Sequence, residues 1–144
     1  MFTAAHSALL FTVLTLATTA YFFMGGLPLL ILKHDVPLDA RFVRGFFNVY
    51  YRAAFWTSLG AAISFGLWGR FAFAIGAALI AGLTVLLRRH LLQAMDRLGE
   101  QIAASDAAAI GHFRRVHATA LAINLGQLVV LVWGLLQLSR QMAA

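Results

Sequence analysis

The segment from Gly111 to Arg140 carries polar side chains inside an apolar run of about the 20 residues that a bilayer crossing needs. His117, Asn124 and Gln127 follow the three- and four-residue spacing of one helix face. An imidazole and two amides on one face can bind a ligand or hydrogen-bond to neighbouring helices. Because polar side chains within a membrane turn toward protein, this face predicts a helix packed in a bundle and marks the expected site.

Asn124 is the side chain for which the expected inward orientation can be stated most specifically. Its amide would cost a few kcal/mol if it faced lipid, so we expect it to point inward and to hydrogen-bond across helices. Interhelical bonds in membranes average only about 0.6 kcal/mol, so a purely structural Asn124 would tolerate leucine. If Asn124 instead orients a ligand together with His117, its replacement by alanine would abolish ligand retention in a folded bundle.

The five histidines are the candidates for metal or haem ligands. His112 and His117 are five residues apart and lie on different faces of one helix, so they are a poor pair for one metal ion, and we expect no metal site. Two histidines from different helices could hold a haem in the bundle interior, as in four-helix membrane cytochromes. Alternatively, a histidine near the end of a span hydrogen-bonds to a carbonyl or a lipid phosphate. We place four near one end of the bundle, namely His34, His90, His112 and His117, and only His6 near the other.

Several catalytic signatures are absent from the sequence. It has no Walker-type glycine loop, no HExxH motif, no serine elbow and no carboxylate within an apolar run. ATP-driven transport, zinc proteolysis and carboxylate proton relays therefore have no support. The chain also has no cysteine, which excludes disulfides, thiolate metal sites and cysteine nucleophiles.

The elements that would position these side chains are long apolar runs. The chain is 62% hydrophobic and only 11% charged, and a soluble core of 144 residues could not bury so much apolar surface. The sequence predicts an all-α, four-helix transmembrane bundle in a single domain, residues 1–144. We place the spans at approximately 5–32, 53–69, 71–87 and 117–138. We interpret the first run as a retained span because it lacks the basic leading region of a signal peptide.

Two of the predicted helices continue beyond the apolar spans. The third continues through residues 88–105 as a cytoplasmic extension, and its successor is capped by Ser105 or Asp106. The second begins with an interfacial segment before its span starts near Ala53. Between the second and third helices, almost nothing polar interrupts the apolar sequence, so we expect a tight turn and antiparallel neighbours.

Basic residues predict the orientation and the partners. They cluster in the first and third links and the adjoining turns, whereas the opposite side has only Arg70 and Arg140. By the positive-inside rule, both termini are non-cytoplasmic in a multi-pass protein of the cell membrane, an inner membrane in a Gram-negative bacterium. The net charge of +6 favours contact with membrane lipids over nucleic acid. We assign anionic lipid or ligand contact to four arginines: Arg41, Arg44, Arg114 and Arg115.

A weak internal repeat relates the two halves of the chain at an offset of 66 residues. In this alignment Tyr51 corresponds to His117, and Ser58 corresponds to Asn124. If the repeat is real, these polar groups lie close together at the centre of the bundle. Glycine and alanine on several helix faces would also allow a second copy to pack closely as a homo-oligomer.

Two stretches resemble a known group of proteins. The sequence GFFNVYYRAAFW and the sequence FRRVHATALAINLGQLVVLV resemble those of small four-helix membrane proteins of the anthrone oxygenase-like and related uncharacterised families. The resemblance extends over most of the chain in span number, length and the aromatic-basic entry to the second helix. It implies a four-helix bundle and oxygenation or binding of a flat, lipophilic aromatic compound. It assigns no catalytic residue.

Three functions are consistent with the sequence. The first is a membrane-embedded site for a lipophilic aromatic or quinone-like molecule, lined by Tyr51, Arg52, His117, Asn124 and Gln127. The second is a haem b-binding electron carrier that uses histidines from two helices. The third is a non-enzymatic accessory or scaffold protein in which the polar face only holds helices together. The sequence leaves open whether the protein is an enzyme.

Overall fold

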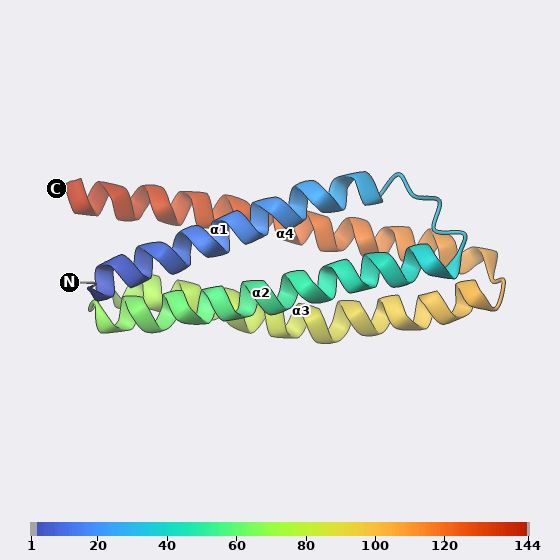
Figure 1. Ribbon diagram of the computed structural model, residues 1–144, viewed down its shortest axis with the longest axis horizontal. Helices are drawn as coiled ribbons and strands as arrows, with labels where there is room; N and C mark the ends of the chain where they lie inside the picture. The colour runs from blue at the N-terminus through green and yellow to red at the C-terminus, as the bar shows by residue number, and fades with distance from the viewer. Residues whose placement is uncertain (1–2, 144) are drawn as a thin grey trace.

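The computed structural model describes residues 3–143 as four α-helices joined by short links (Figure 1). The helices are α1 (Ala4–Leu29), α2 (Pro37–Leu67), α3 (Phe71–Ala103) and α4 (Ala107–Ala143). Successive helices run antiparallel, so the α2–α3 turn and the two chain ends lie at one end of the bundle, which we call the terminal end. The α1–α2 and α3–α4 links lie at the other, which we call the link end. The predicted all-α four-helix bundle is confirmed.

The four helices form a ring in cross-section. α2 packs extensively against both α1 and α3, whereas α4 closes the ring by lighter contacts with α3 and α1. Consequently α2 and α4 lie diagonally across the bundle, as do α1 and α3. Side chains on the inner face of α4 therefore point toward α2 across the bundle axis.

Three helices are long and apolar enough to cross a membrane, namely Ala4–Leu29, Phe71–Ala103 and Ala107–Met142. α2 is not among them. Its path is nevertheless fixed by its neighbours, since α1 and α3 run in the same direction and α2 connects the end of one to the start of the other (Figure 1). Any bilayer crossed by α1 and α3 is therefore crossed by α2 as well.

The helix boundaries follow from local chemistry. Pro37 begins α2, where its missing N–H removes no helical hydrogen bond. Gly69 adopts a φ of 78° in the tight turn before α3, a conformation that favours glycine. Asp106 precedes α4, and its Oδ1 accepts a hydrogen bond from the backbone N–H of Ala108 at 3.0 Å. This contact identifies Asp106, of the two residues expected from the sequence, as the cap.

The predicted extension of the third helix is confirmed, because α3 continues without a break to Ala103. α2 is likewise continuous from Pro37, so its entry segment and its apolar segment form one helix. The spans expected at 53–69 and 117–138 are thus the terminal-end portions of longer helices.

The face of α1 that carries hydroxyls packs inside the bundle. Thr12, Thr15 and Thr19 are buried, and each donates its hydroxyl to the carbonyl four residues earlier, at 2.7–2.8 Å. These bonds satisfy the hydroxyls within α1 itself, so the threonines can face apolar neighbours without a polar partner on another helix.

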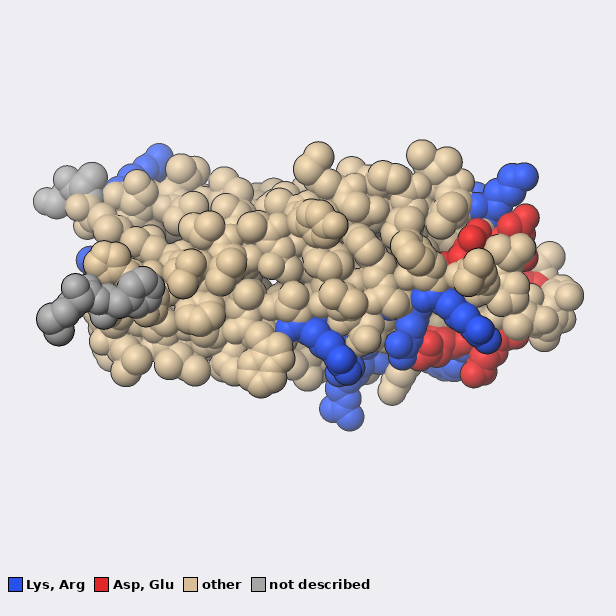
Figure 2. Space-filling model, viewed as in Figure 1, with Lys and Arg blue, Asp and Glu red and all other residues tan. Residues whose placement is uncertain are grey.

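Buried apolar side chains form two clusters of unequal size. The larger cluster lies at the link end and includes the fully buried rings of Phe47, Tyr51 and Phe113. The smaller cluster lies at the terminal end and contains four buried residues, Ala8, Ala61, Phe65 and Leu138. Figure 2 shows that the acidic side chains visible on this face gather at the link end, whereas most of the remaining surface is uncharged.

Candidate functional site

The polar face of α4 lies inside the bundle. His117, Asn124 and Gln127 are buried, as are Ala120 and Leu131 on the same face. The three- and four-residue spacing therefore predicted the inward face of this helix correctly.

Gln127 makes the polar contact that crosses the bundle. The Tyr50 hydroxyl of α2 donates a hydrogen bond to Gln127 Oε1 at 2.7 Å, between two helices that lie diagonally opposite. Asn124 is buried as expected, but neither atom of its amide has a hydrogen-bond partner. The prediction that Asn124 hydrogen-bonds across helices is therefore wrong. The Tyr50 hydroxyl bonds instead to Gln127, which lies one turn farther along α4.

Several buried polar atoms have no hydrogen-bond partner among the described residues. They belong to five side chains: both ring nitrogens of His34 and His117, both amide atoms of Asn124, Ser58 Oγ and Gln127 Nε2. Each such atom costs about 1–3 kcal/mol when it is left unsatisfied. Their concentration along the inside of one bundle indicates sites where a ligand, an ion or water would be favourably bound.

Two of these side chains, His34 and His117, lie together. His34 belongs to the α1–α2 link and His117 to α4, and their ring centroids are 5.6 Å apart with an angle of 76° between the planes. Phe113 lies 5.3 Å from the His34 ring, and Phe47 lies 5.5 Å from the His117 ring. The fold thus buries a pair of histidines next to the aromatic rings of Phe47 and Phe113.

Burial sets the charge of His34. Removal of the ring from water lowers its pKa, because an imidazolium loses more solvation than a neutral imidazole. The Leu32 carbonyl and the Asp39 carboxylate act in the opposite direction, although neither ring nitrogen makes a well-formed hydrogen bond. The net lowering leaves His34 neutral at pH 7.

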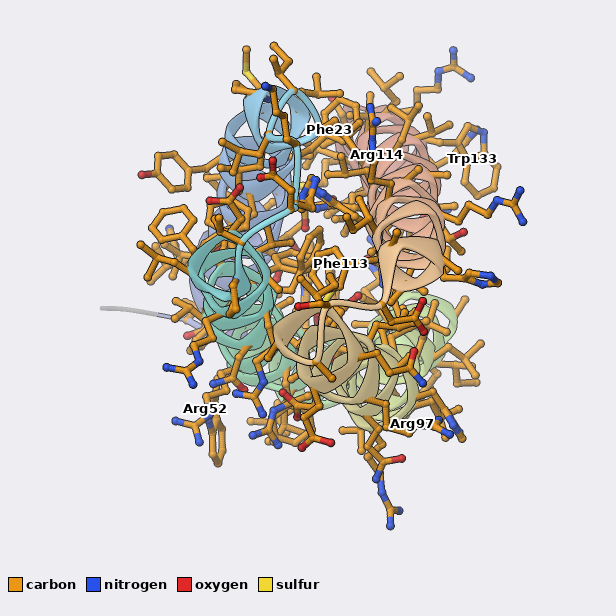
Figure 3. All side chains as sticks on the ribbon, turned by 90° about the vertical axis from the view of Figure 1, so that its right-hand side faces the viewer. Phe23, Arg52, Arg97, Phe113, Arg114 and Trp133 are labelled. Carbon is orange, nitrogen blue, oxygen red and sulfur yellow. The ribbon has the colours of Figure 1, made fainter. Side chains whose placement is uncertain are left out.

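Tyr51 and Arg52 of α2, which were both expected to line a ligand site, have different environments. Tyr51 is buried, and its ring centroid lies 5.1 Å from that of Tyr50. Arg52 is exposed and points away from the bundle, as Figure 3 shows. The bundle therefore brings Tyr51 inside with the polar face of α4 and leaves Arg52 on its outer surface.

A cavity of about 500 Å³ lies at the terminal end, within the 300–1,000 Å³ typical of small-molecule sites. All four helices contribute to its wall, which is mainly apolar. The stacked rings of Phe65 and Phe73, with centroids 5.4 Å apart, form one side. Its polar groups are the unpartnered Ser58 hydroxyl, two threonines of α1, and Gln137 and Gln141 of α4.

The rim of this cavity faces outward between α3 and α4. Ala72 and Gly76 of α3 line it and are exposed, as are Val130 and Trp133 of α4. Trp133 points outward from the bundle in Figure 3. The opening is therefore lateral, through the side of the bundle.

None of the five residues expected to line a ligand site borders this cavity. Gln127 comes nearest along the chain, one helical turn before Leu131 in the cavity wall. The polar face and the cavity are thus successive parts of the same inward face of α4. The sequence analysis did not predict the cavity. The sequence feature that could have indicated it is the run of small residues in α3, which lies opposite Gly134 in the cavity wall.

The arginines expected to contact anionic groups lie at the surface of the link end. Arg41, Arg114 and Arg115 are exposed. Arg44 is partly buried, and its guanidinium donates two hydrogen bonds to the Asp96 carboxylate, at 2.8 and 3.1 Å. Arg44 is therefore engaged by α3, while the other three remain accessible.

No group of three or more potential metal-ligating side chains occurs in the described part of the chain. The chain matches no protein-family model, no curated protein and no solved structure. Function is accordingly inferred from the geometry of the bundle.

Proposed function

We propose that this protein is a multi-pass cell-membrane protein that binds a lipophilic small molecule in the cavity between α3 and α4. The observation that carries the proposal is the lateral opening of an apolar cavity of about 500 Å³ at the terminal end of the bundle. A ligand dissolved in the bilayer could enter through such an opening without crossing water. The cavity is large enough for a compound of drug-like size.

The distribution of charge supports the placement in the membrane. The terminal-end portions of α1, α3 and α4 are apolar, and most arginines lie at the link end. A bilayer around the terminal end would therefore leave the link end in water. By the positive-inside rule the link end is cytoplasmic, and both termini are on the opposite side of the cell membrane.

The cavity wall favours an aromatic or quinone-like ligand. Phe65 and Phe73 present stacked rings, and flat aromatic ligands pack favourably against such rings. The Ser58 hydroxyl has no partner within the bundle, so a carbonyl or hydroxyl of the ligand could hydrogen-bond to it. The resemblance to the anthrone oxygenase-like families implies the same ligand class.

A fluorescence titration tests the proposal. Trp56 and Trp68 are first replaced by phenylalanine, so that Trp133 at the cavity rim is the one tryptophan left. The protein in nanodiscs is then titrated with a short-chain benzoquinone, which quenches tryptophan fluorescence. We expect saturable quenching, and we expect Gly134→Leu or Gly76→Leu to abolish the saturable part by filling the cavity.

Two other glycines provide matched controls. A side chain at Gly126 of α4 or Gly82 of α3 meets no atom within 4 Å, as at Gly134 and Gly76, but neither residue lines the cavity. Gly126→Leu and Gly82→Leu should therefore leave the saturable quenching intact. Quenching that rises linearly in the unmodified chain, or that is equal in all four leucine variants, would reject the cavity as the site and favour the scaffold function.

The orientation is tested separately with single cysteines, since the chain has none of its own. Ala104→Cys lies at the link end and Ser139→Cys near the terminal end, and both positions are exposed. In intact spheroplasts we expect a membrane-impermeant maleimide to label position 139 and to label position 104 only after lysis. The reverse pattern would invert the proposed topology.

A further inference from the structure

The His34 and His117 pair lies outside the cavity proposed for the lipophilic ligand, because neither residue lines it. Both side chains have 0% exposure, and no ring nitrogen has a hydrogen-bond partner among the described residues. The two residues are brought together from separate elements, the α1–α2 link and α4. Two buried, unpartnered imidazoles in contact are chemically unusual, since each gives up hydrogen bonds to water.

The separation of the two rings is that of two ligands on one ion. A nitrogen–metal distance of about 2.0–2.1 Å, with one nitrogen from each ring, holds the ring centroids roughly 5 to 6.3 Å apart as the angle at the metal opens from tetrahedral to linear. The observed separation is 5.6 Å. The observed separation therefore falls within the range that one shared ion would require.

A backbone carbonyl also lies near each ring, although neither forms a hydrogen bond with it. The Leu32 carbonyl acts on the His34 ring, and the Gly26 carbonyl acts on the His117 ring. Histidines that bind metals usually direct the second ring N–H to a carbonyl or carboxylate, which fixes the tautomer and leaves one nitrogen for the ion. Because no ring nitrogen of His34 or His117 makes a hydrogen bond in the described structure, each histidine has a nitrogen available to an ion.

The backbone of His34 is held in an uncommon conformation. Its φ of 57° lies in the left-handed region, which costs a non-glycine residue on the order of 1 kcal/mol. The rest of the link holds the residue in this state, and the side chain is consequently turned into the bundle against His117. Strained residues of this kind concentrate at sites of ligand binding.

The surroundings select the charge and type of ion. Phe47 and Phe113 flank the pair, and no carboxylate makes a hydrogen bond to either ring. The cost of burying an ion rises steeply with its charge, so a monovalent ion is favoured over a divalent one. Asp35 and Asp39 add a weak attraction at His34, and Arg114 opposes it.

Two neutral imidazoles satisfy an ion of low coordination number. Zinc sites use at least three protein ligands, and magnesium and calcium prefer oxygen ligands. Copper is well suited to imidazole, and Cu(I) is monovalent and accepts two ligands. We propose that His34 and His117 bind one Cu(I) ion, which joins the α1–α2 link to α4.

Competition with a coloured chelator tests this site. The detergent-purified protein is treated with Cu(I) in the presence of ascorbate under nitrogen and titrated with bicinchoninate. We expect one copper per chain, and we expect His34→Gln or His117→Gln to weaken binding by at least about tenfold, since loss of a direct ligand costs no less than loss of a neighbouring group. His90→Gln and His112→Gln, at exposed positions, should have no effect.

A second variant separates the copper site from a purely structural role of the histidines. His117→Met exchanges an imidazole for a thioether, a ligand that retains Cu(I) and disfavours Zn²⁺. We expect this variant to hold copper within about tenfold of the unmodified chain, with one sulfur ligand by X-ray absorption. Retention of copper by the glutamine variants, its absence from the unmodified chain, or a haem Soret band that depends on both histidines would each overturn the proposal. The leucine variants that fill the α3–α4 cavity should bind copper normally, so the two proposals can fail independently.

Discussion

The link end and the terminal end are built from the same four helices but are packed differently. At the link end, aromatic and long aliphatic side chains from α2, α3 and α4 fill the interior; they include Phe47, Tyr51, Leu92, Met95 and Phe113. At the terminal end, the buried core is small, and the first ten residues of α3 contribute none of its buried positions in the described chain. The space between α3 and α4 is instead a cavity.

The proposed solvents of the two ends explain this difference. In water, burial of apolar surface stabilises the fold by about 25 cal/mol per Å², so a water-exposed end must close around a core. In lipid, the surroundings are as apolar as the side chains, and helices gain little by burying them. A membrane-embedded end can therefore keep an apolar cavity that would be costly at the link end.

Packing also differs between the two sides of the terminal end. A Cβ atom added at Gly60 would lie 2.6–2.8 Å from atoms of the Phe11 ring, so α1 and α2 approach closely there. A Cβ atom added at Gly76 or Gly134, on the cavity side, would meet nothing within 4 Å. The cavity thus lies opposite a tightly packed pair of helices.

The largest expected effect tests the packed link end. Phe113→Ala removes a ring with 0% exposure and should lower the free energy of unfolding by about 3–5 kcal/mol, through lost burial and the void it leaves. Denaturation in detergent, followed by circular dichroism, measures the loss. Leu136→Ala, at an exposed position, is the control and should change stability little. Equal losses from the two variants would mean that the link end has no well-packed core.

The next effect tests the α1–α2 side of the terminal end. Gly60→Ala should destabilise the bundle by about 1–3 kcal/mol, because its methyl group overlaps the Phe11 ring. Gly66→Ala lies in the same helix with open space around it, and alanine should stabilise it by about 0.5–1 kcal/mol. Thermal denaturation of both variants gives the two signs. A stabilising Gly60→Ala would show that α1 and α2 do not approach closely.

A smaller effect concerns the boundary between the two ends, where the polar face of α4 crosses the interior. Gln127→Leu leaves the Tyr50 hydroxyl without its acceptor and should cost about 1 kcal/mol. Asn124→Leu removes two buried amide atoms that have no partner, so we expect no loss of stability and a gain of about 1 kcal/mol or more. Parallel denaturation curves compare the two. A loss of stability for Asn124→Leu would indicate that its amide binds water or a ligand in the folded protein.

The smallest effect lies on the surface of the link end. Arg44→Ala breaks the ion pair with Asp96, whose side chain is 49% exposed, and should cost about 0.5 kcal/mol or less. The coupling energy from a double-mutant cycle with Asp96→Ala should decrease further in high salt. A coupling above about 2 kcal/mol would show that this pair, and not the aromatic core, holds α2 to α3.

Much of the architecture could be predicted from the sequence. The long apolar runs predicted four helices, and the spacing of His117, Asn124 and Gln127 predicted which side of α4 is buried. The candidate site was predicted less completely. Arg52 was expected inside and lies outside, while the wall of the cavity consists largely of small apolar residues that carry no chemical signal of their own.

The sequence by itself determined the helices and their inward faces, because helical periodicity depends only on residues a few positions apart. Tertiary structure decided which inward side chains meet. It paired Tyr50 with Gln127 in preference to Asn124, and it brought His34 from a link against His117 in α4. These contacts depend on side-chain length and on how the helices lie against one another, and both are set only when distant segments pack together.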